Sequence, residues 1–143
     1  MSLGLYLHIP YCFSKCRYCD FYSAPGQRGV PRAYVDALLR ELSRFAPDAP
    51  LRPDTLYFGG GTPSLLDPAD AARLISAAQP LPGAEITLEA NPETVTEDSL
   101  RAFREAGVNR ISFGVQSARD SQLKTLGRPH TAKQARAAFA AAR

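Results

Sequence analysis

Three cysteines near the amino terminus are the residues whose type and spacing point most directly to chemistry. Cys12, Cys16 and Cys19 are the only cysteines of the 143-residue chain, and they follow the pattern Cys-x-x-x-Cys-x-x-Cys. A single disulfide leaves one of these thiols unused, and a closed tetrahedral zinc site needs one more ligand. A cubane iron–sulfur cluster held by three thiolates uses all of them and leaves one iron open. The spacing therefore favours a cluster with an iron available for a further ligand.

Zinc is the alternative, because His8 lies four residues before Cys12 and offers a fourth ligand. Against zinc, His8 falls inside an apolar strand pattern, and structural zinc sites usually pair two Cys-x-x-Cys knuckles. His8 is interpreted as a packed or hydrogen-bonded strand residue. The second histidine, His130, is interpreted as a polar residue at the entry of a helix.

Composition and charge exclude several classes of function. The 17 basic and 14 acidic residues are mixed along the chain and give a net charge of only +3. This distribution contains no polybasic stripe for nucleic acid or an anionic membrane. No apolar run approaches the roughly 20 residues that span a bilayer. Clustered thiols without a signal peptide predict a cytoplasmic protein.

Short apolar segments alternate with amphipathic ones along the chain. Strands are predicted at residues 3–9, 55–58, 85–90 and 110–115. Helices are predicted to begin at Pro31 (with an apolar face that includes Phe45), at Asp67, at Thr96, at Leu123 and after Thr131. Four strand–helix units predict an α/β fold with a parallel sheet, either a barrel or a doubly wound sheet. The helical pattern still runs at Arg143 and four units cannot close a barrel, so residues 1–143 are expected to be the N-terminal part of a longer protein.

Further unusual motifs follow the predicted strands, where parallel α/β folds collect their ligands. They are the glycine loop at residues 59–63, Glu89 with the following Asn91-Pro92, and residues 114–117. Taken alone, each has an ordinary explanation: a tight turn for the glycines and for Asn91-Pro92, and a solvated carboxylate for Glu89. Tyr18 is either a core aromatic or a wall against a planar ring. Their convergence on one rim predicts a binding site.

The motifs together resemble a known family. The cysteine pattern with Tyr18 before the last cysteine is that of the radical S-adenosylmethionine (SAM) superfamily. Further segments are similar to the oxygen-independent coproporphyrinogen III oxidase-like family, and within it most similar to the HemW branch of heme chaperones. These segments are residues 6–12 (Tyr-Leu-His-Ile-Pro-Tyr-Cys), 59–66 (Gly-Gly-Gly-Thr-Pro-Ser-Leu-Leu), 89–92 (Glu-Ala-Asn-Pro) and 109–117 (Asn-Arg-Ile-Ser-Phe-Gly-Val-Gln-Ser).

This resemblance implies the fold and the site residues. It implies an incomplete (β/α)6 radical SAM barrel, a partial TIM barrel of which four βα units are present. It implies that Cys12, Cys16 and Cys19 hold a 4Fe–4S cluster whose open iron is chelated by SAM. It further implies SAM contacts from the residues that match the family motifs, which are Tyr6, Tyr18, Gly60, Gly61, Thr62, Glu89, Gln116 and Arg128.

One position bears on the reaction. By resemblance, the true oxidases carry a further cysteine two residues after the third one, and this chain has Phe21 there. The difference favours heme handling, with heme as cargo and an acceptor protein that the sequence does not identify. Oxidative decarboxylation of coproporphyrinogen III is the alternative, and a zinc-binding structural module is the remote one. No motif for heme attachment is present, and no catalytic residue is assigned.

Overall fold

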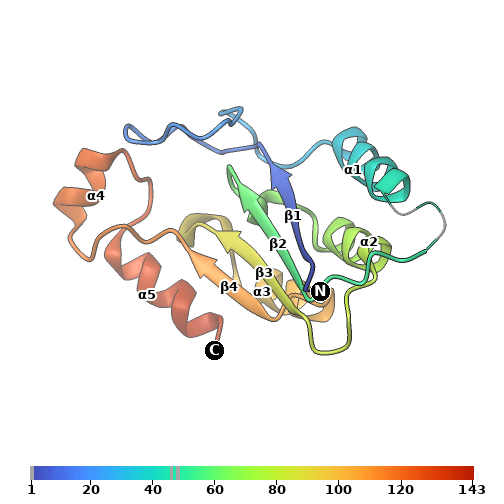
Figure 1. Cartoon of the computed structure of the whole chain (residues 1–143). Helices are drawn as coiled ribbons and strands as arrows, with labels where there is room; N and C mark the ends of the chain where they lie inside the picture. The colour runs from blue at the N-terminus through green and yellow to red at the C-terminus, as the bar shows by residue number, and fades with distance from the viewer. Residues whose placement is uncertain (1, 46, 48) are drawn as a thin grey trace.

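The computed structural model describes residues 2–45, 47 and 49–143. A single sheet forms its centre, and the helices connect successive strands (Figure 1). The strands are β1 (Gly4–Ile9), β2 (Thr55–Gly60), β3 (Glu85–Ala90) and β4 (Arg110–Phe113). The helices are α1 (Arg32–Phe45), α2 (Pro68–Ala78), α3 (Glu97–Glu105), α4 (Asp120–Leu126) and α5 (Ala132–Ala141), with short 3-10 turns η1 (Pro63–Leu65) and η2 (Pro92–Thr94).

The sheet is parallel throughout, and its spatial order β1-β2-β3-β4 equals the order in the chain. A doubly wound sheet reverses direction at a switch point, whereas a barrel adds each strand beside the previous one. The sequential order therefore decides between the two predicted architectures in favour of a barrel segment. The prediction of an α/β partial barrel with four βα units is confirmed.

The core lies between the sheet and α1, α2 and α3. Alternate strand residues face the helices, and Leu56, Phe58 and Leu88 are completely buried there. Val35 and Leu42 of α1 pack against the same core. Phe45, which was expected on the apolar face of α1, is the last residue of the helix and is 76% exposed, so it does not join the core.

The sequence signals at the helix ends act as predicted. The side chain of Asp67 accepts a hydrogen bond from the backbone N–H of Ala69 at the start of α2. Thr96 and Thr131 form capping boxes at the starts of α3 and α5. These caps satisfy backbone donors that the first helical turn leaves free.

Two strand ends differ from the predicted bounds, and both differences concern the functional rim. β2 continues into the glycine loop and ends at Gly60, because Gly59 and Gly60 remain paired in register with β1. β4 ends at Phe113 rather than at residue 115. The backbone turns there, and Gln116 adopts the left-handed conformation with φ 59°.

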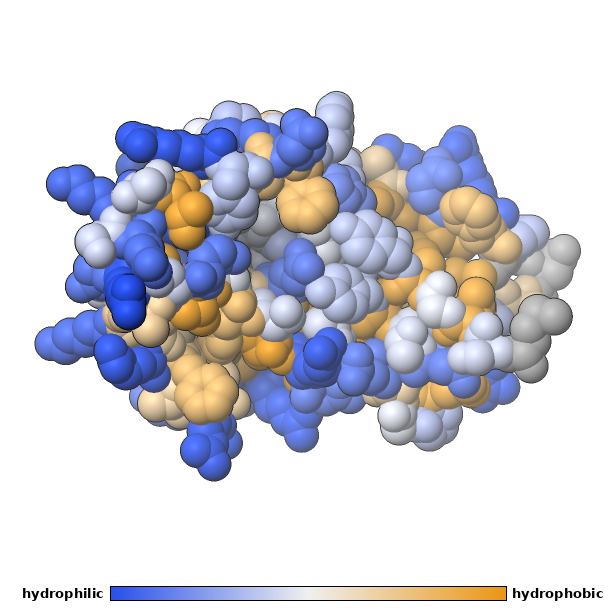
Figure 2. Space-filling view, turned by 60° about the vertical axis from the view of Figure 1, so that its left-hand side comes forward, coloured by the Kyte–Doolittle hydropathy of each residue, from blue (hydrophilic) through white to orange (hydrophobic). Residues whose placement is uncertain are grey.

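Hydrophilic and hydrophobic side chains intermingle over the face of the molecule shown in Figure 2. Large apolar side chains also reach the surface, including Phe21, Tyr22 and Phe139. Among the helices of the described residues, none combines the length and the apolar character needed to cross a membrane.

Candidate metal and cofactor site

A cavity of about 290 Å³ opens at the carboxyl ends of the strands. Segments that follow all four strands contribute to its wall, as the sequence predicts for this rim. The three cysteines line it together with most of the other predicted site residues. Those residues are Tyr18, Gly60, Gly61, Thr62, Glu89, Gln116 and Arg128.

The cysteine loop, residues 10–31, leaves β1 and crosses the top of the sheet toward α4 (Figure 1). Its base is closed by two backbone hydrogen bonds, from Ala24 N–H to the Pro10 carbonyl at 2.6 Å and from Cys12 N–H to the Ala24 carbonyl at 3.0 Å. The far side of the loop is attached to α4, because Arg17 N–H donates to the Leu126 carbonyl at 3.2 Å. The loop is thus fixed above the cavity both at its base and at the far side that contacts α4.

All three cysteines are free thiols. Cys12 is buried, whereas Cys16 and Cys19 are partly exposed to the cavity. Within the described ranges 2–45, 47 and 49–143, no three side chains of histidine, cysteine, aspartate or glutamate are grouped as ligands of a single metal ion.

The glycine loop lies directly against the cysteine loop. Gly61 N–H donates to the Ile9 carbonyl and Thr62 N–H donates to the Tyr11 carbonyl, both at 2.8 Å. A Cβ atom at Gly61 would lie 2.7 Å from the Tyr11 carbonyl oxygen and 2.9 Å from Cys12 Sγ. Glycine is therefore required here by close backbone approach, which explains why the motif is more than a turn.

Glu89 is held in place rather than free in solvent. Its Oε1 accepts a hydrogen bond from the Tyr57 hydroxyl at 2.8 Å, and its Oε2 accepts one from Gly60 N–H at 3.2 Å. Burial, and then the hydrogen bond and negative charge of Glu89, raise the pKa of the Tyr57 phenol. The carboxylate is thereby oriented at the rim, and part of its accepting capacity remains for a ligand.

Arg128 connects the segment after α4 with the cysteine loop and β3. Its Nη2 donates to Asn91 Oδ1 at 2.6 Å and to the Gly114 carbonyl at 2.7 Å, and its Nη1 donates to Cys16 Sγ at 3.2 Å. The buried Nε of Arg128 finds no acceptor among the residues that the structure describes. A buried donor of this kind is normally satisfied, so it marks a place where a ligand or water oxygen fits.

The aromatic residues of the predicted site separate into two positions. Tyr18 lines the cavity and is 49% exposed, which fits a wall rather than a core residue. Burial raises its pKa, and the Arg128 charge opposes that rise. Tyr6, in contrast, does not line the cavity: it stacks on Tyr57, its partner in the β1–β2 register, with ring centroids 5.9 Å apart.

His8 and Asn91, neither of which was assigned as a site residue from the sequence, differ in where they lie. His8 has both ring nitrogens engaged, Nε2 with the Tyr22 carbonyl at 3.1 Å and Nδ1 with the Tyr6 hydroxyl at 3.3 Å. It is a hydrogen-bonded strand residue, as predicted. Asn91, for which a tight turn was the ordinary explanation of its motif taken alone, lines the cavity, and its amide also donates to Thr62 Oγ1 at 3.2 Å. Its position directly after the strand that carries Glu89 was the available signal.

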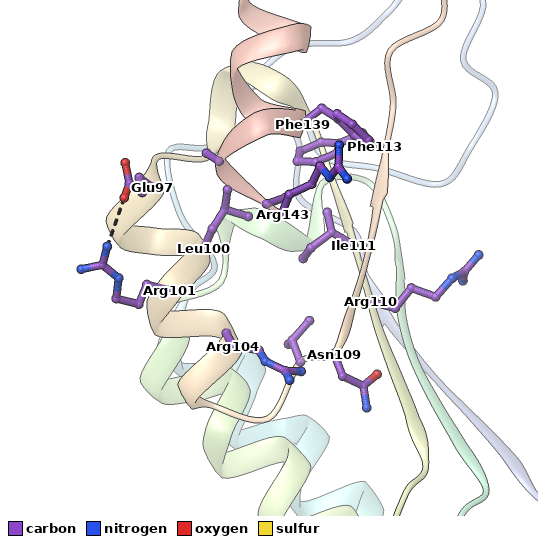
Figure 3. A pocket seen from close by; sticks show the side chains of 13 residues that line it. Glu97, Leu100, Arg101, Arg104, Asn109, Arg110, Ile111, Phe113, Phe139 and Arg143 are labelled. Carbon is purple, nitrogen blue, oxygen red and sulfur yellow. Dashed lines mark hydrogen bonds and ion pairs between the residues drawn. The ribbon is translucent and has the colours of Figure 1, made fainter.

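A larger cavity of about 560 Å³ lies between α3, β4 and the end of α5 (Figure 3). Figure 3 shows Arg101 turned toward Glu97 on the surface of α3, away from Phe113 and Phe139. Its lining includes neither cysteine nor histidine among the described residues, so this cavity lacks the thiol chemistry of the rim.

The chain matches the family model of the radical SAM superfamily over residues 6–143. It is 47% identical over 142 residues to the heme chaperone HemW of Escherichia coli K12, which covers 95% of this chain and 38% of that protein. It is 41% identical over 142 residues to the radical S-adenosyl methionine domain-containing protein 1, mitochondrial, of Bos taurus, covering 92% of this chain and 31% of that protein. The chain thus spans about a third of the length of these relatives.

Solved structures agree with the sequence relatives. The structure of coproporphyrinogen III oxidase (HemN) from Escherichia coli, a radical SAM enzyme, superposes with a TM-score of 0.85 at 31% identity, covering 99% of this chain and 34% of that chain. The cobalamin-dependent radical SAM enzyme OxsB shares the fold, with a TM-score of 0.63 at 17% identity. Because the family model spans nearly the whole sequence, the chain belongs to the radical SAM superfamily.

Proposed function

We propose that the chain binds a 4Fe–4S cluster and SAM in the rim cavity, and that it serves a HemW-type protein that handles heme. The observation that carries this proposal is the shared cavity. Three free thiols line it together with a glycine loop, an oriented carboxylate and an arginine whose Nε is buried. Such a set matches the chemistry of a cluster with an open iron beside a zwitterionic, nucleoside-containing ligand.

In this proposal Cys12, Cys16 and Cys19 hold the cluster as thiolates. The Arg128 guanidinium lies 3.2 Å from Cys16 Sγ and stabilises negative charge on that sulfur. The absence of a side chain at Gly61 lets the glycine loop pack directly beside Cys12 without displacing its sulfur. Cysteines that form no disulfide are typical of a reducing compartment, which supports a cytoplasmic location.

SAM would occupy the part of the cavity formed by β2, β3 and the segment after β4. Glu89 would accept hydrogen bonds from ribose hydroxyls and the Gln116 amide would accept or donate them, because both side chains line the cavity. The orphaned Nε of Arg128 offers a charge-assisted hydrogen bond to the methionine carboxylate. Tyr18 supplies a planar wall, and Tyr6 contributes indirectly by packing on Tyr57.

A cluster bound in this way supplies one-electron reduction of the sulfonium of SAM and so gives access to radical chemistry. The residues of this chain bind, orient and shield the reacting groups. No side chain at the rim is assigned as an acid or base.

Two candidate activities follow from the relatives. Heme handling is preferred, because relatives at 35–47% identity carry the name heme chaperone HemW. Coproporphyrinogen III oxidation is the second candidate, favoured by the TM-score of 0.85 with the HemN structure. Phe21 lines the cavity at the position where, by resemblance, the oxidases have another cysteine, and this substitution favours the chaperone.

Anaerobic reconstitution tests the cofactors. The wild-type protein is expected to bind about four iron atoms with broad visible absorption that bleaches on reduction, and Cys16→Ser is expected to lose both. Ser14→Ala is the matched control, because Ser14 lines the same cavity without a thiol. A colourless protein with one tightly held zinc ion would contradict the proposal.

The two activities are separated with the full-length protein. Incubation with coproporphyrinogen III, SAM and a reductant is expected to give no protoporphyrinogen, whereas stoichiometric heme binding is expected from absorption titration. Turnover of coproporphyrinogen would refute the chaperone assignment.

A further inference from the structure

His130 is buried beside the rim cavity, and both its ring nitrogens face acceptors. Its side chain has 0% exposure, Nδ1 lies 3.1 Å from Glu93 Oε2, and Nε2 lies 3.1 Å from the Val115 carbonyl oxygen. A carbonyl only accepts, so the Nε2 contact places a hydrogen on that ring nitrogen, whereas the hydrogen of the Nδ1 contact lies on the ring or on the Glu93 carboxyl group. In either case His130 forms hydrogen bonds to two partners in different segments. The prediction that His130 lies at the entry of a helix is confirmed, since α5 begins two residues later. Its side chain, however, is buried in the interior.

The two partners of His130 belong to different segments of the rim. Glu93 lies in η2, two residues after Asn91, and Val115 lies in the turn after β4, directly before Gln116. His130 itself follows Arg128 by two residues. The bridge thus joins three segments, each of which places one of the cavity residues Asn91, Gln116 and Arg128.

The backbone at Gln116 explains why such a bridge is needed. Gln116 has φ 59°, a left-handed conformation that costs energy for a residue with a side chain. A strained conformation persists only when neighbouring contacts hold it, and the Val115 carbonyl bonded to His130 lies immediately before it. Releasing this carbonyl would let the segment relax and move the Gln116 amide away from the cavity.

The other charged groups around His130 are engaged elsewhere. On α4, Asp120 Oδ1 accepts from Ala132 N–H at 2.7 Å, and on α3 Glu97 pairs with Arg101. Arg128 is turned toward Asn91, Gly114 and Cys16. Lys133 is exposed on α5. Glu93, whose side chain is 14% exposed, is the carboxylate in direct contact with the ring.

We propose that His130 is a positioning residue for the SAM site: its imidazole ring bridges Glu93 and the Val115 carbonyl and thereby sets Gln116 and Arg128 at the cavity. This inference rests on the proposed SAM binding. Removal of the ring frees both partners and opens the bridge between η2 and the turn after β4.

Two variants separate positioning from mere packing. His130→Ala removes the bridge and is expected to lower SAM affinity about tenfold or more. Glu93→Gln is expected to preserve it, because a glutamine amide donates to a neutral Nδ1 while Nε2–H still donates to Val115. Lys133→Gln, on the exposed side of α5, is the surface control.

The experiment measures equilibrium binding of labelled SAM to the reconstituted full-length protein, and the ring nitrogens of His130 by NMR on the protein before reconstitution. In the wild type and in Glu93→Gln, Nε2 is expected to carry hydrogen, because it donates to the Val115 carbonyl. Glu93→Gln is expected to retain the wild-type SAM affinity, whereas His130→Ala is expected to lose it.

An Nε2 without hydrogen in the wild type, or wild-type affinity in His130→Ala, would overturn the inference. If His130→Ala does not fold, the NMR result and the SAM affinity of Glu93→Ala, which removes one partner of the bridge and is expected to bind more weakly than Glu93→Gln, still decide it. Failure of the wild-type protein to bind SAM would instead refute the proposed function, and the NMR arm would remain interpretable.

Discussion

Arg128 donates a hydrogen bond to Cys16 Sγ at 3.2 Å although the two residues are 112 positions apart in the chain. The same guanidinium also holds Asn91 and the Gly114 carbonyl. One side chain thus joins the cysteine loop, the end of β3 and the turn after β4. A contact of this sequence separation exists only after the sheet has formed and the loops have closed over it.

Replacing Arg128 with glutamine should weaken SAM binding more than it weakens the fold. The change removes charge-assisted hydrogen bonds, each worth about 1.5–3 kcal/mol, so the affinity is expected to fall by about tenfold or more. Equilibrium binding to the reconstituted protein measures this. Arg101→Gln is the matched control, because Arg101 forms an exposed pair with Glu97 on α3. Equal affinities in the two variants would argue against a role of Arg128 in binding.

Gly61→Ala should impair assembly of the cluster. Its Cβ would lie 2.9 Å from Cys12 Sγ and 2.7 Å from the Tyr11 carbonyl oxygen, so the cysteine loop must shift. We expect a lower iron content after reconstitution. Gly29→Ala provides the comparison, since the nearest atom there is 3.9 Å away and the added methyl fits. Full iron content in Gly61→Ala would mean that the loop can yield without losing its ligand geometry.

Glu89→Gln should lower the pKa of Tyr57. Burial is the largest cause of the raised pKa and remains, whereas the hydrogen bond to a charged acceptor and the Coulomb repulsion are removed. A spectrophotometric alkaline titration, compared with Tyr57→Phe to identify the phenol, measures the change. An unaltered titration would show that burial alone sets the pKa.

The same pair gives a pH dependence of stability whose sign is determined. Because the pKa of Tyr57 is higher in the folded than in the unfolded chain, its contribution is complete below the ordinary tyrosine pKa. That contribution is lost as the pH rises through the folded-state pKa. Wild type is therefore expected to lose more stability than Tyr57→Phe at alkaline pH. Parallel losses in denaturant unfolding experiments would contradict this expectation.

Phe58→Ala should test the core beneath the rim. Phe58 is completely buried between the sheet and the helices, so its removal is expected to lower the free energy of unfolding by about 3–5 kcal/mol. Phe45→Ala is the matched control because Phe45 is 76% exposed, and its change is expected to stay within about 0.5 kcal/mol. Urea unfolding measures both, and similar losses would mean that the core is not where the structure places it.

The sequence alone determined the fold class and much of the site. Alternating apolar segments, caps such as Asp67 and Thr96, and a local motif such as Cys12–Cys19 act over a few residues, so their pattern is legible along the chain. The strand-end rule then placed the glycine loop, Glu89 and Gln116 at one rim, because parallel strands end at the same edge.

Tertiary structure decided which side chains meet. Asn91 became a partner of Arg128 and Thr62, His130 became a buried bridge, and Tyr6 remained outside the cavity that the other predicted residues line. Periodicity also could not show that β4 ends at Phe113. These outcomes depend on loop closure and on burial among segments distant in the chain, where a polar group must find whichever partner lies within reach. The spacing of the three cysteines can be recognised in the sequence, whereas the contact of Arg128 with Cys16 exists only in the folded protein.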